Sequence, residues 1–363
     1  MPLTRRKILS LVPGALAAPY VARARAAVSD AAIGQMLLLG FAGSSSDSAG
    51  AQNLARHIEA GNVGGACLLG YNSKSRVGVE GIAALFAASG RQTKPLIAID
   101  QEGGAVQRLG PKLGYSAVPS ARSVAGDNDA AAAQALYQRM ASVMRASGFN
   151  LNLAPVVDLG FEPRNPIVTH YGRAFGKDGA TVARYASAFV AGHREAGVLT
   201  ALKHFPGHGS TLIDSHEHPV DLTPTWRAEE IQPYMAMARS GLIDIVMTGH
   251  LSHAEHTGGE PATLSRKAIE GWLRGPIGYG GVVMTDDLDM AAIRSRYPLN
   301  EAIVRAVAAG NDLVLLSNSA TPDPDLPLKA IAAIRDAVAD GRIRAGRVEE
   351  SAQRLAALKR RIA

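Results

Sequence analysis

Residues 199–222 read LTALKHFPGHGSTLIDSHEHPVDL. A short apolar run ends in Lys203 and His204, and a loop that carries three more histidines and two aspartates follows it. Pro206 and the nearby glycines favour a tight turn over a helix. The segment therefore predicts a buried strand whose carboxyl end presents polar side chains, which is the arrangement found at the functional face of parallel α/β sheets.

The same pattern of strand and helix repeats along the whole chain. The eight predicted strands are residues 36–41, 65–69, 96–100, 150–158, 199–204, 243–250, 281–286 and 312–317. The predicted helices are residues 49–60, 79–88, 129–146, 179–196, 228–240, 265–273, 300–309 and 328–339, with a last helix at 347–360. Eight alternations predict a single-domain (β/α)8 barrel in the α/β class, and an open doubly wound sheet is the alternative.

Polar residues also stand at the carboxyl ends of three other predicted strands. They are Asp100 in LIAIDQEGG, His250 in DIVMTGHLSH, and Asp286 with Asp287 in GVVMTDDLDM. In a (β/α)8 barrel all strands end at one face, and that face holds the active site. We therefore expect these side chains to meet Lys203 and His204 in one cavity.

The positive charge of the chain is concentrated at its start. The formal net charge is +6, and five basic residues lie in the first 27 positions, which contain no Asp or Glu, so that +1 remains for the rest. A nearly neutral domain has no basic stripe for phosphates, which excludes nucleic acid as the expected partner. The single cysteine, Cys67, excludes an internal disulfide.

The first 27 residues have the features of an export signal. A basic start with Arg5 and Arg6 precedes an apolar run from Ile8 to Ala18, and small residues follow around Ala26. The order Thr-Arg-Arg-Lys-Ile-Leu is similar to a twin-arginine signal. We expect residues 1–27 to be this signal and residues 28–363 the catalytic domain. We expect the mature protein to be a periplasmic monomer. We expect no stable membrane insertion, because no later segment is apolar for about 18 residues.

Two pairs of side chains suggest the chemistry. A carboxylate at a strand end, such as Asp286, can attack an electrophilic carbon; Asp287 is its rival, and either could instead cap the following helix. Asp214 and His216, two positions apart in a loop, can form a hydrogen bond that fixes the imidazole tautomer. His216 could then donate a proton to a leaving oxygen and later activate water.

Four strings in the chain, IDQEGGAVQRL, YGRAFG, KHFPGHGSTLIDSH and VVMTDDLDM, occur in this order between residues 99 and 290. They resemble the signatures of the β-N-acetylhexosaminidases of glycoside hydrolase family 3. The resemblance implies a barrel enzyme that removes terminal β-linked N-acetylglucosamine with retention of configuration and without a cofactor or metal. Its substrate would be a small carbohydrate, such as a muropeptide from peptidoglycan.

The resemblance also implies roles for individual residues. Asp286 matches the nucleophile, His216 the general acid/base, and Asp214 the partner of that histidine. The matches to the sugar-binding positions are Asp100, Arg108, Arg173, Lys203 and His204, and His250 and Asp287 are further candidates for the pocket lining. Two departures, Ala105 where an arginine is frequent and Ser210 where an aspartate is frequent, concern subsite preference and not the reaction.

Three alternatives remain open at this stage. A metal-dependent hydrolase could use His204 and His208, followed by Asp214 and His216, with His250 and His253 completing the site. Against it, the glycines place the first two histidines in a loop and not on one helix face. A β-N-acetylglucosaminide phosphorylase could use a neutral histidine that does not repel phosphate. A non-catalytic exported sugar-binding protein would have no need for Asp286.

Overall fold

A computed structural model describes residues 28–91, 93–319, 321–344 and 346–362 of the chain. The expected signal segment, residues 1–27, lies outside the described residues. Among those described, no helix is long and apolar enough to cross a bilayer.

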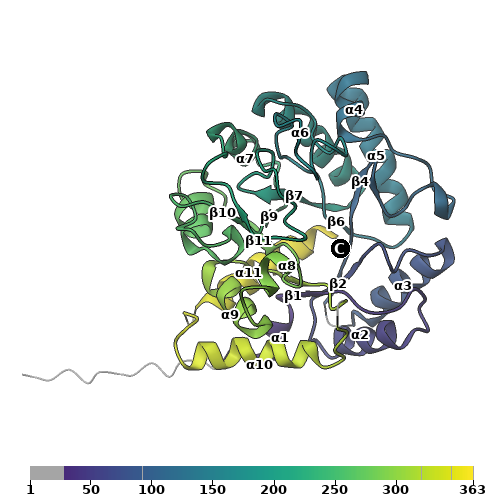
Figure 1. Cartoon of the computed structure of the whole chain (residues 1–363). Coiled ribbons are helices and arrows are strands. Elements are labelled where there is room, and N and C mark those ends of the chain that lie inside the picture. The colour runs from purple at the N-terminus through teal and green to yellow at the C-terminus, as the bar shows by residue number, and fades with distance from the viewer. Residues whose placement is uncertain (1–27, 92, 320, 345, 363) are drawn as a thin grey trace, which may run out of the picture.

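Eight parallel strands form the centre of the molecule, and the (β/α)8 prediction is confirmed (Figure 1). The strands are β1 (Leu37–Leu39), β2 (Gly65–Leu68), β3 (Leu96–Ile99), β6 (Leu151–Asn152), β7 (Leu199–Phe205), β9 (Ile245–Thr248), β11 (Val282–Thr285) and β12 (Val314–Leu316). From β1 to β11 each strand pairs with the next along the chain, and β12 pairs with β1. A parallel bridge between Met284 and Leu313 joins β11 to the start of β12 and closes the ring. Their side chains are buried throughout, as in a barrel whose interior is filled.

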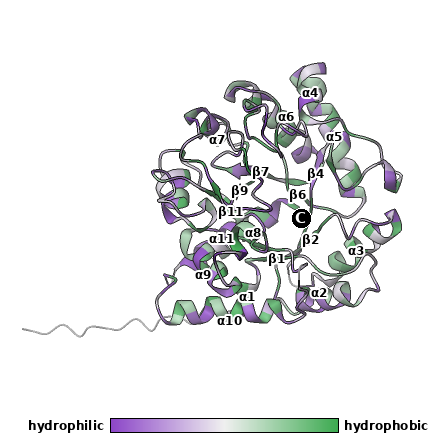
Figure 2. Ribbon diagram, in the orientation of Figure 1, coloured by the Kyte–Doolittle hydropathy of each residue, from purple (hydrophilic) through white to green (hydrophobic). Residues whose placement is uncertain are grey.

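Helices surround the barrel, as the sequence periodicity predicts. They are α2 (Ala49–Glu59), α3 (Arg76–Ser89), α5 (Ala130–Ala146), α6 (Gly179–Glu195), α7 (Gln232–Arg239), α9 (Leu299–Ala309), α10 (Leu326–Ala339) and α11 (Arg347–Lys359). Figure 2 shows both hydrophilic and hydrophobic colours on these helices and mainly hydrophobic colour on the central strands. An amphipathic helix with one apolar face covers such a sheet.

Several short elements lie outside the predicted pattern. The predicted helix at 228–240 is divided into a 3-10 turn, η2 (Ala228–Ile231), and α7, with Pro233 at the start of α7. The segment 265–273 forms a π-helix, η4 (Lys267–Arg274), instead of an α-helix. Three short helices, α1 (Asp30–Gly34), α4 (Ala121–Asp127) and α8 (Ala291–Arg294), and two small sheets, β4 (Gln101–Gly103) with β5 (Val106–Gln107) and β8 (Val220–Asp221) with β10 (Leu251–Ser252), were not predicted.

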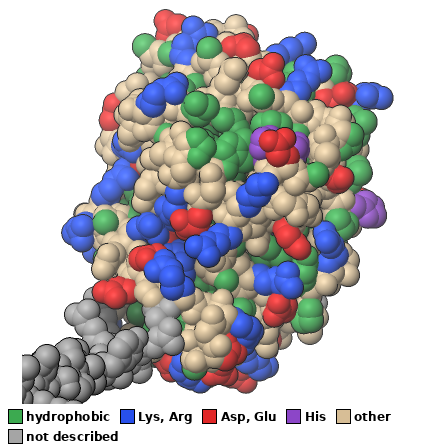
Figure 3. Space-filling view, turned by 90° about the vertical axis from the view of Figure 1, so that its left-hand side faces the viewer, with side chains coloured by type: hydrophobic (Ala, Val, Ile, Leu, Met, Phe, Trp, Pro, Cys, Tyr) green, Lys and Arg blue, Asp and Glu red, His purple; other side chains and the backbone are tan. Residues whose placement is uncertain are grey.

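The outer surface carries charges of both signs. On the face of the described chain that Figure 3 shows, Lys and Arg side chains are interspersed with Asp and Glu. This face therefore offers no continuous basic surface of the kind that nucleic acid requires.

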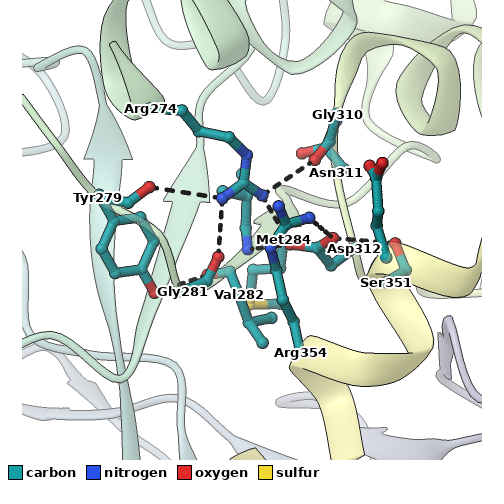
Figure 4. Close-up of polar contacts among 12 residues, drawn as sticks. Arg274, Tyr279, Gly281, Val282, Met284, Gly310, Asn311, Asp312, Ser351 and Arg354 are labelled. Atoms are coloured by element: carbon teal, nitrogen blue, oxygen red, sulfur yellow. Dashed lines mark hydrogen bonds and ion pairs between the residues drawn. The ribbon is translucent and has the colours of Figure 1, made fainter. Parts of the chain in front are cut away.

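A buried carboxylate joins the last helix to the barrel at the amino-terminal end of β12 (Figure 4). Asp312 Oδ1 accepts hydrogen bonds from Arg347 Nη2 at 2.6 Å and Arg354 Nη1 at 3.1 Å, both on α11. Its Oδ2 accepts from Arg274 Nη2 at 2.9 Å and from the backbone of Val283 at 3.0 Å. Burial alone would raise the pKa of Asp312, but the arginines hold it below the usual value.

We expect Asp312→Ala to lower the free energy of unfolding by about 3 to 5 kcal/mol, because it leaves buried arginines without their carboxylate. Urea unfolding at pH 7 measures this. Since the folded pKa of Asp312 is lowered, its contribution is present above the unfolded pKa and is lost as the pH falls through the folded pKa. Asp340→Ala, on the exposed surface, is the control and should leave the unfolding midpoint unchanged; an equal midpoint for Asp312→Ala and wild type would contradict the prediction.

Candidate active site

A cavity of about 260 Å³ opens at the carboxyl ends of the barrel strands. It is lined by Leu69, Asp100, Glu102, Val106, Arg108, Leu153, Arg173, Lys203, His204, His216, Met247, Asp286, Asp287, Met290 and Leu315. The structure thus brings together eight of the ten residues singled out in the sequence. The other two, Asp214 and His250, do not line the cavity, but each contacts a residue that does: Asp214 contacts His216, and His250 contacts Asp287.

Two carboxylates and two cations form a cluster on one side of the cavity. Arg173 donates from Nε and Nη2 to the two carboxylate oxygens of Glu102, both at 2.8 Å. Lys203 Nζ lies 2.8 Å from Asp100 Oδ1 and 2.9 Å from Glu102 Oε1. Arg108 is placed more loosely, with Nη2 3.9 Å from Asp100 Oδ2. Such a group of fixed charges can bind sugar hydroxyls by charge-assisted hydrogen bonds.

Glu102 is a member of this cluster that the sequence reasoning did not assign. It lies in β4, one of the short strands that the periodicity did not predict. Burial alone would raise the pKa of Glu102, but Arg173 and Lys203 hold it well below its ordinary value. Glu102 is therefore ionised at neutral pH, and its two oxygens contact both Arg173 and Lys203.

We expect Glu102→Gln to raise KM by about 10- to 100-fold, because Arg173 and Lys203 lose a charged partner that fixes their geometry. Steady-state kinetics on an aryl glycoside measures this. Glu162→Gln, which removes the carboxylate of an exposed pair with Arg164, is the matched control. An unchanged KM in a folded Glu102→Gln protein would show that the cluster does not depend on Glu102.

A second buried carboxylate, Asp158, fixes the turn after β7. Its Oδ2 lies 2.8 Å from His204 Nδ1, and its Oδ1 accepts from the backbone N–H of His204 at 3.1 Å and of His208 at 2.8 Å. The imidazole of His204 is thereby oriented, so that Nε2 is left for another partner. Asp158 ends the predicted strand 150–158, so the strand-end rule could have identified it.

His216 reaches the cavity from the loop that follows β7. Its Nδ1 lies 2.7 Å from Asp214 Oδ1, and the same oxygen accepts from the backbone N–H of His216 at 2.8 Å. The His216 side chain is 60% exposed, whereas the neighbouring Ser215 is buried and lies 2.9 Å from the buried His208 ring. The contact between Ser215 and His208 therefore anchors the loop to the buried part of the protein. The acid/base candidate, His216, faces solvent and the cavity.

Asp286 and Asp287 follow β11 and differ in their surroundings. Burial alone would raise the pKa of Asp286, but His250, His204 and His216 lower it to about 2. Burial raises the pKa of Asp287 to about 6. Asp287 Oδ1 accepts from the backbone of Asp289 at 3.0 Å and of Ser317 at 2.9 Å, so it is committed to holding the loop. Neither carboxylate caps α8, whose N-cap residue is Met290.

His250 was expected as a further residue of the pocket lining, and the structure corrects this. Its ring is buried, with Nδ1 3.0 Å from Thr263 Oγ1 and Nε2 2.7 Å from the backbone oxygen of Asp287. Both ring nitrogens are therefore used within the protein. His250 supports Asp286 electrostatically and does not line the cavity.

His204, His208 and His253 were considered for a metal site, and one ring nitrogen of each contacts another protein group. Within the described part of the chain, no group of three or more His, Cys, Asp or Glu side chains is arranged to hold a metal ion. His204 and His208 turn to Asp158 and Ser215, and His253 Nδ1 accepts from the backbone of Glu255 and His256, both at 3.2 Å.

Comparisons with known proteins identify the family of this chain. The model described as "Glycosyl hydrolase family 3 N terminal domain" matches residues 28–358. The chain belongs to glycoside hydrolase family 3. It is therefore a glycosidase, and the resemblance of its motifs to this family is confirmed.

Relatives and solved structures in this family match over most of the chain. A protein of Xylella fastidiosa named beta-hexosaminidase is 39% identical over 82% of this chain and 87% of its own length. Beta-hexosaminidase LpqI of Mycobacterium tuberculosis is 35% identical over 78% of this chain and 71% of its own length. The structure of a glycoside hydrolase family 3 beta-N-acetylglucosaminidase from Paenibacillus has 35% identity and a TM-score of 0.83, and covers 93% of this chain. The chain spans 63% of that protein's length.

Proposed function

We propose that this family 3 glycosidase is a retaining β-N-acetylhexosaminidase that removes terminal, non-reducing β-linked N-acetylglucosamine. The observation that carries the proposal is that Asp286 and His216 line the same cavity as the Asp100, Arg173 and Lys203 cluster. A nucleophile, a proton donor and fixed hydroxyl-binding charges are the parts that such a reaction requires. The names of the relatives agree with this specificity.

In the first step, Asp286 attacks the anomeric carbon while the bond to the leaving oxygen breaks. His216 gives its Nε2 proton to that oxygen, and Asp214 holds Nδ1 and stabilises the imidazole in the required tautomer. A covalent glycosyl-Asp286 ester forms. In the second step, His216 takes a proton from water, the water oxygen attacks the anomeric carbon, and Asp286 leaves as a carboxylate, so that the configuration is retained.

The remaining residues hold the sugar. Asp100, Arg108, Arg173, Lys203 and His204 are proposed to bind its hydroxyl and acetamido groups. Their ion pairs fix them before the substrate arrives, so that little ordering is required on binding. Orientation of the anomeric carbon against Asp286 then contributes to the rate.

A panel of 4-nitrophenyl β-glycosides that differ only at C2 tests this specificity. We expect the 2-acetamido substrate to be hydrolysed with a much higher kcat/KM than the glucoside, and the first-formed sugar to be the β anomer. Parallel reactions with and without inorganic phosphate separate hydrolysis from phosphorolysis. A faster glucoside, or a sugar phosphate as the main product, would overturn the proposal.

The natural substrate and location are also proposals. The twin-arginine pattern in residues 1–27 supports export ahead of a catalytic domain at 28–363, where peptidoglycan fragments would supply terminal N-acetylglucosamine. Replacing Arg5 and Arg6 by lysine should leave the protein in the cytoplasmic fraction. Periplasmic recovery of that variant would argue against this export route.

A further inference from the structure

A second and larger cavity lies next to the candidate active site. Its volume is about 600 Å³, and its lining includes Gly70, Lys74, Gly104, Ala105, Arg108 and Lys112. Neither Asp286 nor His216 lines it. Nothing in the proposed mechanism uses this cavity.

Two chain segments form a shared wall between the cavities. Leu69 and Val106 line the catalytic cavity, whereas their neighbours Gly70 and Ala105 line the second one. Arg108 lines both. A group that extends from the catalytic cavity past Arg108 therefore enters the second cavity.

The second cavity is basic, and of its three cations Arg108 alone lies near a described carboxylate, with its Nη2 3.9 Å from Asp100 Oδ2. Its lining contains three cations, Lys74, Arg108 and Lys112, and no aspartate or glutamate. Within the described residues, neither lysine forms an ion pair or a side-chain hydrogen bond, and the buried Nε of Arg108 has no partner. The cations of the catalytic cavity differ, because Arg173 and Lys203 each lie within 2.9 Å of a carboxylate.

Small residues keep this basic cavity open beside Arg108. A Cβ atom at Gly70 would lie 3.3 Å from Arg108 Nη1, so even a methyl group there would press on the guanidinium. Ala105 is exposed and adds only a methyl group to the wall. The wall therefore leaves room for a substituent next to three positive charges.

We propose that the second cavity binds an anionic group, a carboxylate or a phosphate, carried at C6 of the terminal sugar. This inference rests on the proposed function, in which Arg108 and Asp100 hold the sugar by its hydroxyl groups. The shared wall lies at that hydroxyl-binding side and not at Asp286 and His216, where the leaving group departs. We place the group at C6 because the exocyclic C6 arm extends beyond the pyranose ring and can carry a phosphate or be oxidised to a carboxylate.

Three aryl substrates test the proposal: 4-nitrophenyl β-N-acetylglucosaminide, its 6-phosphate, and the analogue with a carboxylate at C6. We expect the wild type to hydrolyse at least one anionic substrate with a kcat/KM no lower than that of the neutral one. The Lys74→Gln/Lys112→Gln double variant should lose about tenfold in kcat/KM on that anionic substrate and less than twofold on the neutral one. The preference should also fall with increasing salt.

Lys267→Gln, on η4 and outside the cavity, is the matched control and should change none of the three values. The two anionic substrates show whether phosphate or carboxylate is the preferred group. Rejection of both by the wild type, or equal losses on all three substrates in the double variant, would overturn the inference. Failure of the wild type on the neutral substrate would instead count against the proposed function, so the two failures are distinguishable.

Discussion

Asp286→Ala should reduce kcat on an aryl β-N-acetylglucosaminide by at least about 10,000-fold, because removing a covalent nucleophile leaves only binding and orientation. Of the two carboxylates that follow β11, Asp286 is the one whose pKa is lowered, to about 2, by His250, His204 and His216. It is therefore ionised at neutral pH, as a nucleophile must be. Its replacement should leave the far-UV circular dichroism and the unfolding midpoint close to those of the wild type.

Asp287 provides the matched control for this prediction. Its carboxylate accepts two backbone hydrogen bonds, from Asp289 and Ser317, so Asp287→Asn should affect stability more than chemistry. A 2-acetamido 5-fluoro glycoside should trap the covalent intermediate, and mass spectrometry of the digested protein should find the label on Asp286. A label on Asp287, or a kcat for Asp286→Ala within tenfold of wild type, would remove Asp286 from the role of nucleophile.

His216→Ala should lower kcat/KM by about 100- to 10,000-fold on substrates with poor leaving groups, the range usual for general acid catalysis. On a 2,4-dinitrophenyl glycoside the loss should be small, because that leaving group departs without a proton. Since kcat/KM reports the steps through cleavage, the comparison isolates the acid role of His216. Azide should raise kcat on the activated substrate by replacing the water that His216 no longer deprotonates.

Glu217→Ala is the control for the loop, because Glu217 is the exposed neighbour of His216. It should leave the activity on both classes of substrate unchanged. Equal losses for His216→Ala on poor and activated leaving groups would exclude the acid role. The Asp214→Asn variant should reproduce part of the His216 effect, because the imidazole loses the carboxylate 2.7 Å from its Nδ1.

The fold could be predicted because its signals are local. Each barrel strand is a short run of buried apolar residues, and most of the longer helices repeat their apolar residues at helical spacing. The short helices α1, α4 and α8 span five, seven and four residues and contain too few turns to show a period. Helix η4 has a helical apolar pattern but hydrogen bonds of the π type, which the pattern does not distinguish.

The candidate site could be predicted only in part. Asp100, Lys203, His204 and Asp286 stand at the carboxyl ends of predicted strands, so the barrel geometry alone places them at one face. Arg108 and Arg173 lie in loops and were named only through their family motifs. His250 also follows a strand, but its ring turns to Thr263 and Asp287, a direction that no linear pattern specifies.

The sequence by itself determined the barrel, the order of its strands and the polar residues at their carboxyl ends, because hydrophobic periodicity and strand termination are properties of neighbouring residues. Only the tertiary structure decided which charges pair: Glu102 with Arg173 across 71 positions, and Asp100 with Lys203 across 103. Such pairs form only when barrel closure brings distant segments together and burial leaves each charge few partners. For the same reason, only the fold placed Lys74, Arg108 and Lys112 around one cavity.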